Sequence, residues 1–278
     1  MKFYNLIFIF LLTTLQSQTI KISGDFTLNA SPYKIVVLDQ SIQNIYYHLS
    51  FLNNPKNSNS KIETLCVLQL GKNFSKFTDY NTLRQDSLTK KDSEKEKIGA
   101  DEINQMLALK EKWKPTLVKS ILEEKYIIQD RAKNRYQYEE EQPIFKWTLN
   151  NETKEILGYN CKKATTEYRG RKYIAWYTAD IPINNGPYIF QGLPGLIMQI
   201  EDTKSHYSFT AIAIDRKTIP VYLRNEEQIL HVRREQFRKV EKSLHENPGF
   251  FYGEAYDSNG NSVRDRGKPL PYNPIELE

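Results

Sequence analysis

The most constraining feature of the sequence is a pair of strand-like runs separated by a short turn in the middle of the chain. The runs cover residues 159–168 and 172–178 and are rich in β-branched and aromatic side chains, which favour extended backbone. The intervening Arg169-Gly170-Arg171 places a glycine where a tight turn often needs a left-handed residue. This pattern predicts an antiparallel hairpin.

Further strand-like runs follow one another without the regular helices of a parallel α/β protein. In the run over residues 207–214, Phe209 and Ala211 alternate with Thr210 and Ile212. Both faces of that strand are therefore expected to be covered. The sequence predicts a mainly β (α+β) fold, an antiparallel curved sheet in the form of a bowl or sandwich with one or two helices. The other predicted strands are residues 33–38, 45–52, 64–70, 143–149, 196–201 and 207–214.

Two segments have helical spacing. The first begins near Asp101, which can cap it, and ends before Pro115. The second is a late amphipathic helix between Asn225 and Pro248, with the apolar stripe Ile229, Leu230, Phe237, Val240 and Leu244. Residues 117–128 fit either a helix or a strand. The opposite face of the late helix is basic, but glutamates interrupt it, so we interpret it as solvated and not as a phosphate or lipid site; it comprises Arg233, Arg234, Arg238, Lys239 and Lys242.

Charge is distributed evenly over the chain. The 39 Lys and Arg residues against 34 Asp and Glu residues give a net charge of +5, and the two signs are interleaved. The chain therefore lacks the basic stripe of a nucleic-acid-binding protein, and no nucleic-acid partner is expected. Residues near 85–100 are the most densely charged, and we expect them to form an exposed, mobile insertion.

The first 17 residues have the pattern of a secretory signal peptide. Lys2 precedes an apolar run over residues 6–12, and residues 13–17 are polar. The apolar run is shorter than the roughly 20 residues of a transmembrane helix, and a buried N-terminal helix is the alternative. We expect cleavage between Ser17 and Gln18, leaving one domain over residues 18–278 that has no transmembrane segment and is periplasmic or secreted.

The chain has two cysteines, Cys66 and Cys161. An even number of cysteines in an exported protein favours a disulfide between them. The alternative is two buried free thiols, because cysteine is among the most buried residue types.

The motif Gly192-Leu193-Pro194-Gly195-Leu196-Ile197 follows two further distinctive segments, residues 168–182 and 186–191, and residues 157–164 and 272–277 add weaker support. Together these segments resemble the GLPGLI family of exported Bacteroidetes proteins. The resemblance implies export and no particular reaction. Asp86-Ser87-Leu88 is similar to a three-residue O-glycosylation signal of exported Bacteroidetes proteins, which makes Ser87 a candidate acceptor.

The motif itself has two interpretations. A phosphate-binding loop would need Lys or Ser/Thr at the start of a following helix, and here a strand follows. Gly192 and Gly195 permit unusual backbone angles, Pro194 fixes one, and Leu193, Leu196 and Ile197 can be buried, which describes a structural corner. A loop that contacts a ligand is the alternative.

Aromatic residues near the motif are candidates for a binding groove. They could line an apolar or sugar-binding surface with Asp180 beside it, or they could belong to the core. The aromatic candidates are Tyr173, Trp176, Tyr177, Tyr188 and Phe190.

No residue pattern specifies a catalyst, a cofactor or a metal. The four histidines, His48, His206, His231 and His245, lack the spacing of a metal-binding helix. Adjacent carboxylates such as Glu201 and Asp202 would point to opposite faces of a strand. We therefore expect a non-enzymatic envelope module that binds a partner protein or a hydrophobic or saccharide ligand. The alternative is a secreted or periplasmic hydrolase with its active site near the Gly192–Ile197 loop.

Overall fold

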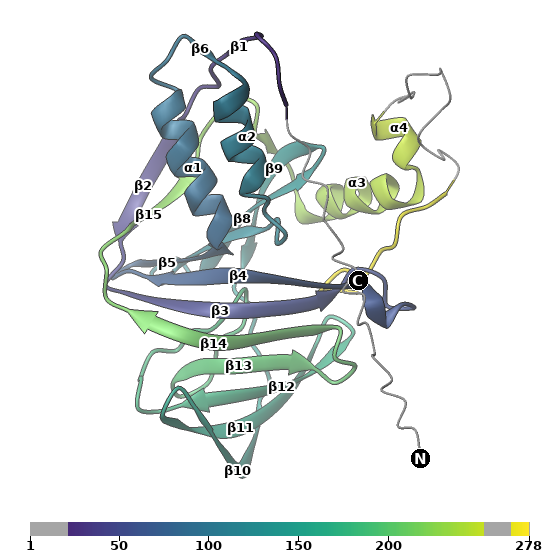
Figure 1. Ribbon diagram of the computed structural model, residues 1–278. Helices are drawn as coiled ribbons and strands as arrows, with labels where there is room; N and C mark the ends of the chain where they lie inside the picture. Colours follow the sequence, from purple (N-terminus) through teal and green to yellow (C-terminus); the bar gives the residue numbers. More distant parts are fainter. Residues whose placement is uncertain (1–21, 253–267, 278) are drawn as a thin grey trace, which may run out of the picture.

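A curved 12-stranded sheet dominates the computed structural model, which describes residues 22–252 and 268–277 (Figure 1). Neighbouring strands are antiparallel, except that β16 runs parallel to β9. In spatial order the sheet contains β10 (Thr148–Ile156), β11 (Tyr159–Tyr168), β12 (Arg171–Thr178), β13 (Leu196–Asp202), β14 (Tyr207–Asp215), β3 (Gln43–Leu52), β4 (Lys61–Leu70), β5 (Phe74–Asp79), β7 (Thr116–Ser120), β8 (Lys125–Ala132), β9 (Asn134–Glu141) and β16 (Leu230–His231).

Two small sheets and several helices cover the large sheet. Figure 1 shows α1 and α2 beside the ribbon formed by β2 and β15, whereas α3 and α4 lie on the opposite side of the molecule. A single 3-10 turn, Ser58–Ser60, connects β3 and β4. The remaining elements are β1 (Leu28–Asn29) paired with β6 (Lys97–Ile98), β2 (Ile35–Gln40) paired with β15 (Pro220–Arg224), α1 (Tyr80–Asp92), α2 (Ala100–Ala108), α3 (Arg234–Glu246) and α4 (Pro248–Tyr252).

Both faces of the sheet are buried where β5 meets β7. Phe77 pairs with Leu117 and Lys76 pairs with Val118, and the two pairs point to opposite faces because side chains alternate along a strand. Phe77 and Leu117 are each 1% exposed, and burial of each stabilises the fold by about 2 kcal/mol. On the other face, the Lys76 Nζ atom lies 3.5 Å from the ring centroid of Tyr222 in β15.

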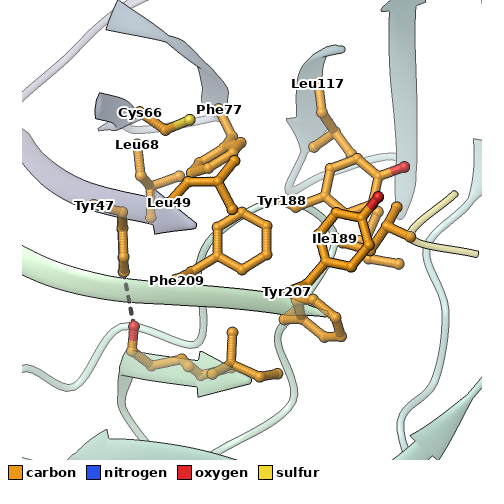
Figure 2. Packing of buried hydrophobic residues seen from close by; sticks show 14 of the residues in the cluster. Tyr47, Leu49, Cys66, Leu68, Phe77, Leu117, Tyr188, Ile189, Tyr207 and Phe209 are labelled. Atoms are coloured by element: carbon orange, nitrogen blue, oxygen red, sulfur yellow. Dashed lines mark hydrogen bonds between the residues drawn. The ribbon is translucent and has the colours of Figure 1, made fainter. Parts of the chain in front are cut away.

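The main core lies on the face of the sheet that carries Phe77 and Leu117 (Figure 2). Phe77 packs edge-to-face against Phe209 with ring centroids 5.9 Å apart. The buried Tyr47 hydroxyl donates a hydrogen bond to the Ile197 carbonyl oxygen at 2.7 Å, which satisfies a polar group that would be costly to bury alone. This bond ties β3 to β13 across the core.

The predicted fold class, a mainly β protein with an antiparallel curved sheet and a late amphipathic helix, is confirmed. The strands on either side of Gly170 pair as expected, from Lys162 with Tyr177 to Tyr168 with Arg171. Residues 117–128, for which the sequence left a choice, form β7 and the start of β8.

Several details of the secondary structure differ from expectation. The late helix begins at Arg234, so Ile229 and Leu230 precede it, and Leu230 lies in β16. Strand β10 covers residues 148–156, not 143–149, because its turn is at Leu157-Gly158, where both residues have positive φ. Helix α2 is capped by Gly99 in place of Asp101. In β14 only one face is buried, since Ile212 is 48% exposed beside a bulge between Ala211 and Ala213.

The prediction of an exposed insertion near residues 85–100 is wrong in part. Helix α1 includes the first half of this segment, and its residues Asp86, Thr89 and Asp92 are buried on one face. Asp86 pairs with Arg224 and accepts a hydrogen bond from the Tyr222 hydroxyl at 2.8 Å. A buried helix face made of polar side chains leaves no hydrophobic periodicity in the sequence. Ser87 is exposed on this helix, and its modification stays a prediction.

The expected disulfide is not present in the structure. Cys66 in β4 and Cys161 in β11 are both free and buried, and β12, β13, β14 and β3 lie between their strands in the sheet. The alternative interpretation, two buried thiols, describes what is observed. Burial raises the pKa of the Cys66 thiol well above its ordinary value and the pKa of the Cys161 thiol to about 11, so neither is a ready thiolate.

The expected signal peptide, residues 1–17, lies outside the described residues. Within residues 22–252 and 268–277, no helix has the length and apolar character needed to cross a membrane.

Candidate ligand cavity

A cavity of about 550 Å³ opens between the end of β3, the loop before β7, helix α3 and residues 272–276 near the C-terminus. Its volume lies in the range of roughly 300–1,000 Å³ that is typical of small-molecule sites. Four segments that are distant in sequence therefore converge on one concave site, which is the best candidate for function.

One wall of the cavity is aromatic. Trp113 and Tyr188 meet at nearly right angles with ring centroids 5.3 Å apart, and Phe51 stacks on Tyr207 at 5.7 Å. Trp113 also contacts the Phe51 ring at 6.2 Å. Edge-to-face and stacked contacts of this kind fix ring orientation, so the wall is preorganised. Tyr188 and Tyr207 appear in Figure 2 beside the core residues that support them.

A second aromatic pair lines the cavity from the side of α3. The rings of His245 and Tyr272 have centroids 4.8 Å apart and are both half-buried. Their exposed surfaces supplement the wall formed by Phe51, Trp113 and Tyr188. Flat apolar surfaces on two sides suit a ring-shaped ligand.

Polar groups line the same cavity. Asp130 in β8 accepts a hydrogen bond from the Arg131 backbone N–H at 2.6 Å. The Glu241 Oε2 atom accepts from the Arg238 guanidinium at 2.5 Å and from the Tyr272 hydroxyl at 3.0 Å. Burial, with the negative charge of Glu241, raises the pKa of Asp130 to about 7, because both effects disfavour the ionised form.

His245 adds a third polar group. Its Nδ1 atom lies 2.6 Å from the Pro271 carbonyl oxygen, and a carbonyl only accepts, so Nδ1 carries the proton. Burial lowers the pKa of His245, which favours the neutral ring with an unprotonated Nε2 atom. The ring therefore offers an acceptor.

Residues 272–277, here called the C-terminal strap, form one side of the cavity. Glu276 is 4% exposed and pairs with Arg169 and Arg234. Its Oε1 atom accepts a hydrogen bond from the Tyr188 hydroxyl at 3.0 Å. Burial alone would raise the pKa of Glu276, but the two arginines outweigh burial and hold that pKa below its ordinary value.

The strap backbone is held as closely as the Glu276 side chain. Arg171 donates hydrogen bonds to the Pro274 carbonyl oxygen and to the Asn273 Oδ1 atom, both at 2.7 Å. Tyr173 donates to the Ile275 carbonyl oxygen at 3.1 Å, and Arg238 donates to the Glu276 carbonyl oxygen at 2.7 Å. The basic face of the late helix is thus only partly solvated, because Arg234 and Arg238 hold the strap.

The structure separates the aromatic candidates into different environments. Tyr173, Tyr177 and Phe190 belong to the buried core, whereas Tyr188 lines the cavity. Trp176 is half-buried, with the Lys154 Nζ atom 5.4 Å from its ring centroid. These residues therefore do not share one groove.

Asp180 does not line the cavity. It is exposed in the turn after β12, and its backbone N–H donates to the Thr178 Oγ1 atom at 3.2 Å. Asp180 therefore occupies a turn and does not belong to a binding groove.

The Gly192–Ile197 motif forms a structural corner at the end of the loop that leads from β12 into β13. Gly192 and Gly195 have φ values of 93° and 148°, which favour glycine. Leu193, Leu196 and Ile197 are at most 2% exposed, as the architectural interpretation predicts. None of these residues lines the cavity.

A buried lysine anchors the loop that precedes the motif. The Lys119 Nζ atom donates to the Asn185 Oδ1 atom at 3.0 Å and to the Phe190 carbonyl oxygen at 3.3 Å. Asn185 in turn donates to the Ser75 hydroxyl at 2.9 Å. Burial lowers the pKa of Lys119 to about 7.

The sequence did not single out the polar residues of the cavity. Glu241 and His245 are four residues apart on a predicted helix and so share a face, which was a usable signal. Asp130 and Trp113 gave none, because β8 and the loop before β7 reach the cavity only after the sheet has formed. Among the described residues, no group of three or more His, Cys, Asp or Glu side chains has metal-binding geometry.

Comparison with known proteins gives a family match and similar solved structures. Residues 117–234 match the family described as the N-glycanase peptide, N-terminal domain, fewer than half of the residues. The structure of PNGF-II in the P21 space group shares 14% identity with a TM-score of 0.48, and the structure of PNGF-II in the C2 space group shares 15% identity with a TM-score of 0.49. Each comparison covers 75% of this chain and 34% of the other, so the chain spans about a third of the length of PNGF-II. No curated protein matches the sequence.

Proposed function

We propose that this chain is an exported, non-enzymatic binding module that holds a saccharide in the cavity beside the C-terminal strap. The observation that carries the proposal is the combination of an aromatic wall, with Trp113 at its centre, and the convergent polar groups Asp130, Glu241 and His245 in one cavity of about 550 Å³. Aromatic faces bind the apolar faces of sugar rings, while a few placed polar groups bind hydroxyls.

The family match directs the choice among ligands. The matched family is described as part of an N-glycanase, which supports a glycan over a lipid or a protein segment as the ligand. The aromatic cavity would suit a hydrophobic ligand as well, but polar groups on its walls would then be left without partners, which is costly.

One observation favours a hydrolase instead. Asp130 and Glu241 are two carboxyl groups in one cavity, and the pKa of Asp130 is raised to about 7, as is typical of acid–base pairs in glycosidases. An active site near the Gly192–Ile197 loop, the alternative that the sequence offered, is not supported, because no residue of that loop lines the cavity.

The test is a titration of the purified protein with N-linked glycans, a fatty acid and phospholipid vesicles, followed by mass spectrometry of the glycans. We expect saturable binding of a glycan and recovery of the glycan intact. The variant Ile62→Trp should weaken binding by filling the cavity, whereas Ile42→Trp, at an exposed site that does not line it, should not. Binding of lipid alone would contradict the proposal, and cleaved glycan would support the hydrolase.

A further inference from the structure

Three side chains of the cavity, those of Asp130, Glu241 and His245, present hydrogen-bond acceptors with unmet capacity. Asp130 uses one carboxylate oxygen, Oδ1, for the Arg131 N–H, and its Oδ2 atom has no hydrogen-bond partner within the described residues. A carboxylate can accept about four hydrogen bonds. Asp130 is half-buried, so this unmet capacity faces a partly dehydrated space where water compensates for it incompletely.

Helix α3 contributes two further acceptors. Arg238 and Tyr272 both donate to the Oε2 atom of Glu241, so Oε1 stays available. His245 donates through Nδ1 to Pro271, so its Nε2 atom is an acceptor. Because Glu241 and His245 are four residues apart on α3, their side chains lie on one helix face.

The Trp113 Nε1 atom is a buried donor of the cavity without a hydrogen-bond partner in the described part of the chain, whereas the other interior donors are engaged. The Arg238 guanidinium bonds Glu241 and the Glu276 carbonyl oxygen. The Tyr188 hydroxyl bonds Glu276, and the Tyr207 hydroxyl bonds the Asn273 carbonyl oxygen. A ligand must therefore bring donors for the acceptors of Asp130, Glu241 and His245. A ligand carboxylate or sulfate would meet the carboxyl groups of Asp130 and Glu241, while the Arg238 cation is already paired and Lys114 lies at an exposed position.

We infer that the saccharide held in this cavity is neutral and donates its hydroxyl hydrogens to Asp130, Glu241 and His245, and that acidic saccharides are excluded from the interior. This inference rests on the proposed function. A carboxylate that accepts from two neighbouring hydroxyls fixes ring orientation, while the wall of Phe51 and Trp113 packs against the ring.

The exposed basic residues of the cavity are Lys61, Lys110, Lys112 and Lys114, which we call its mouth. The other basic residue of the lining, Arg238, is already paired with Glu241, and Lys61 pairs with Glu63 at 2.9 Å. Exposed lysines attract anions weakly and lose that attraction in salt. An acidic saccharide would therefore collect at the mouth at low salt without entering the interior.

The experiment compares a neutral N-linked glycan with its acidic, sialylated counterpart at physiological salt by isothermal titration calorimetry. We expect the neutral glycan to bind at least about tenfold more tightly. Asp130→Asn and Glu241→Gln should each weaken neutral-glycan binding about tenfold and narrow the difference between the two glycans. Glu155→Gln, a matched change at an exposed position of β10 that does not line the cavity, should leave both affinities unchanged.

The outcomes separate this inference from the proposed function. Equal or tighter binding of the acidic glycan, or full affinity in Asp130→Asn and Glu241→Gln, would overturn the inference while leaving a glycan-binding module. Absence of binding for both glycans in the parent protein would overturn the proposed function and the inference with it. Circular dichroism of each variant distinguishes lost binding from lost folding. If the Asp130→Asn protein is unfolded, the affinity of the Glu241→Gln protein for the neutral glycan tests the inference.

Discussion

Gly195 and Thr178 approach so closely that a Cβ atom on Gly195 would lie 2.0 Å from the Thr178 carbonyl oxygen. The contact brings the motif loop against the end of β12, directly before β13 begins. No side chain other than hydrogen fits there without movement of the backbone, so this glycine is required by the architecture of the sheet.

Replacing Gly195 with Ala should therefore destabilise the fold strongly. We expect a loss of at least about 3 kcal/mol in the free energy of unfolding, because positive φ and a backbone clash act together. Gly158→Ala is the matched control, since Gly158 has a φ of 78° but nothing within 4 Å of the added Cβ, and it should cost about 1–2 kcal/mol. Denaturant unfolding measures both, and equal losses would contradict the role given to Thr178.

The Glu276 carboxylate should be essential for docking of the C-terminal strap. Glu276→Gln removes one of the two carboxylates that Arg169 and Arg234 share, and Glu140 is the other. We therefore expect a loss of about 3 kcal/mol, the lower end of the cost of breaking a buried pair. Glu246→Gln, which removes an exposed partner 3.8 Å from Lys242, should cost less than about 0.5 kcal/mol. Because the pKa of Glu276 is lowered, the stability it provides is present above its unfolded pKa and is lost as pH falls through its folded pKa. A thermal unfolding series checks this, and a Glu276→Gln protein as stable as the parent would refute it.

Buried Lys119 should make stability rise with pH. Its pKa falls from 10.5 to about 7 on folding, so between these values the unfolded chain binds more protons and raising the pH favours the folded state. Lys119→Met should reduce the rise in unfolding free energy over this range, with Lys76, whose pKa also falls to about 7 because of burial, providing the remainder. Lys172→Met, at an exposed position, should keep the full pH dependence. An unchanged slope in Lys119→Met would show that this lysine stays charged.

Ligand binding should have its own pH dependence. Hydroxyl donation to Asp130 favours its ionised form, and its pKa of about 7 means that binding should strengthen about tenfold between pH 6 and pH 8. The charged groups that act on Asp130 are Glu241, Lys114 and Arg238, and His245 lines the same cavity with a lowered pKa. Calorimetry at both pH values should show proton release in the parent and a flat profile in Asp130→Asn. An affinity that falls with pH would contradict hydroxyl donation to Asp130.

The sheet was predictable from the sequence because alternation and turn residues are local signals. Gly170 marks the β11–β12 turn, and the burial of Leu193, Leu196 and Ile197 follows from their apolar character. The polar contacts were not predictable. Asp86 is buried because Arg224 and Tyr222 approach it from β15, more than 130 residues away in sequence. The expected export and the even number of cysteines favoured a disulfide between Cys66 and Cys161. The order of strands in the sheet decides whether two cysteines are neighbours, and no local sequence pattern encodes that order.

The cavity depends on long-range geometry in the same way. Phe51, Trp113, Asp130, Tyr188 and Glu241 come from five separate segments. Nothing in residues 272–277 indicates from the sequence that they form a wall of the cavity. They do so because Arg171 and Arg238, which are distant in sequence, donate hydrogen bonds to their backbone.

The most direct test of saccharide binding in this cavity uses tryptophan fluorescence, because Trp113 lines the cavity and Trp147 and Trp176 do not. Titration with a neutral N-linked glycan should give a saturable change in emission in the parent protein. The change should persist in Trp176→Phe and disappear in Trp113→Phe, with calorimetry showing that Trp113→Phe is still folded and binds more weakly. A signal that survives in Trp113→Phe and disappears in Trp176→Phe would place the ligand outside the cavity and contradict the account.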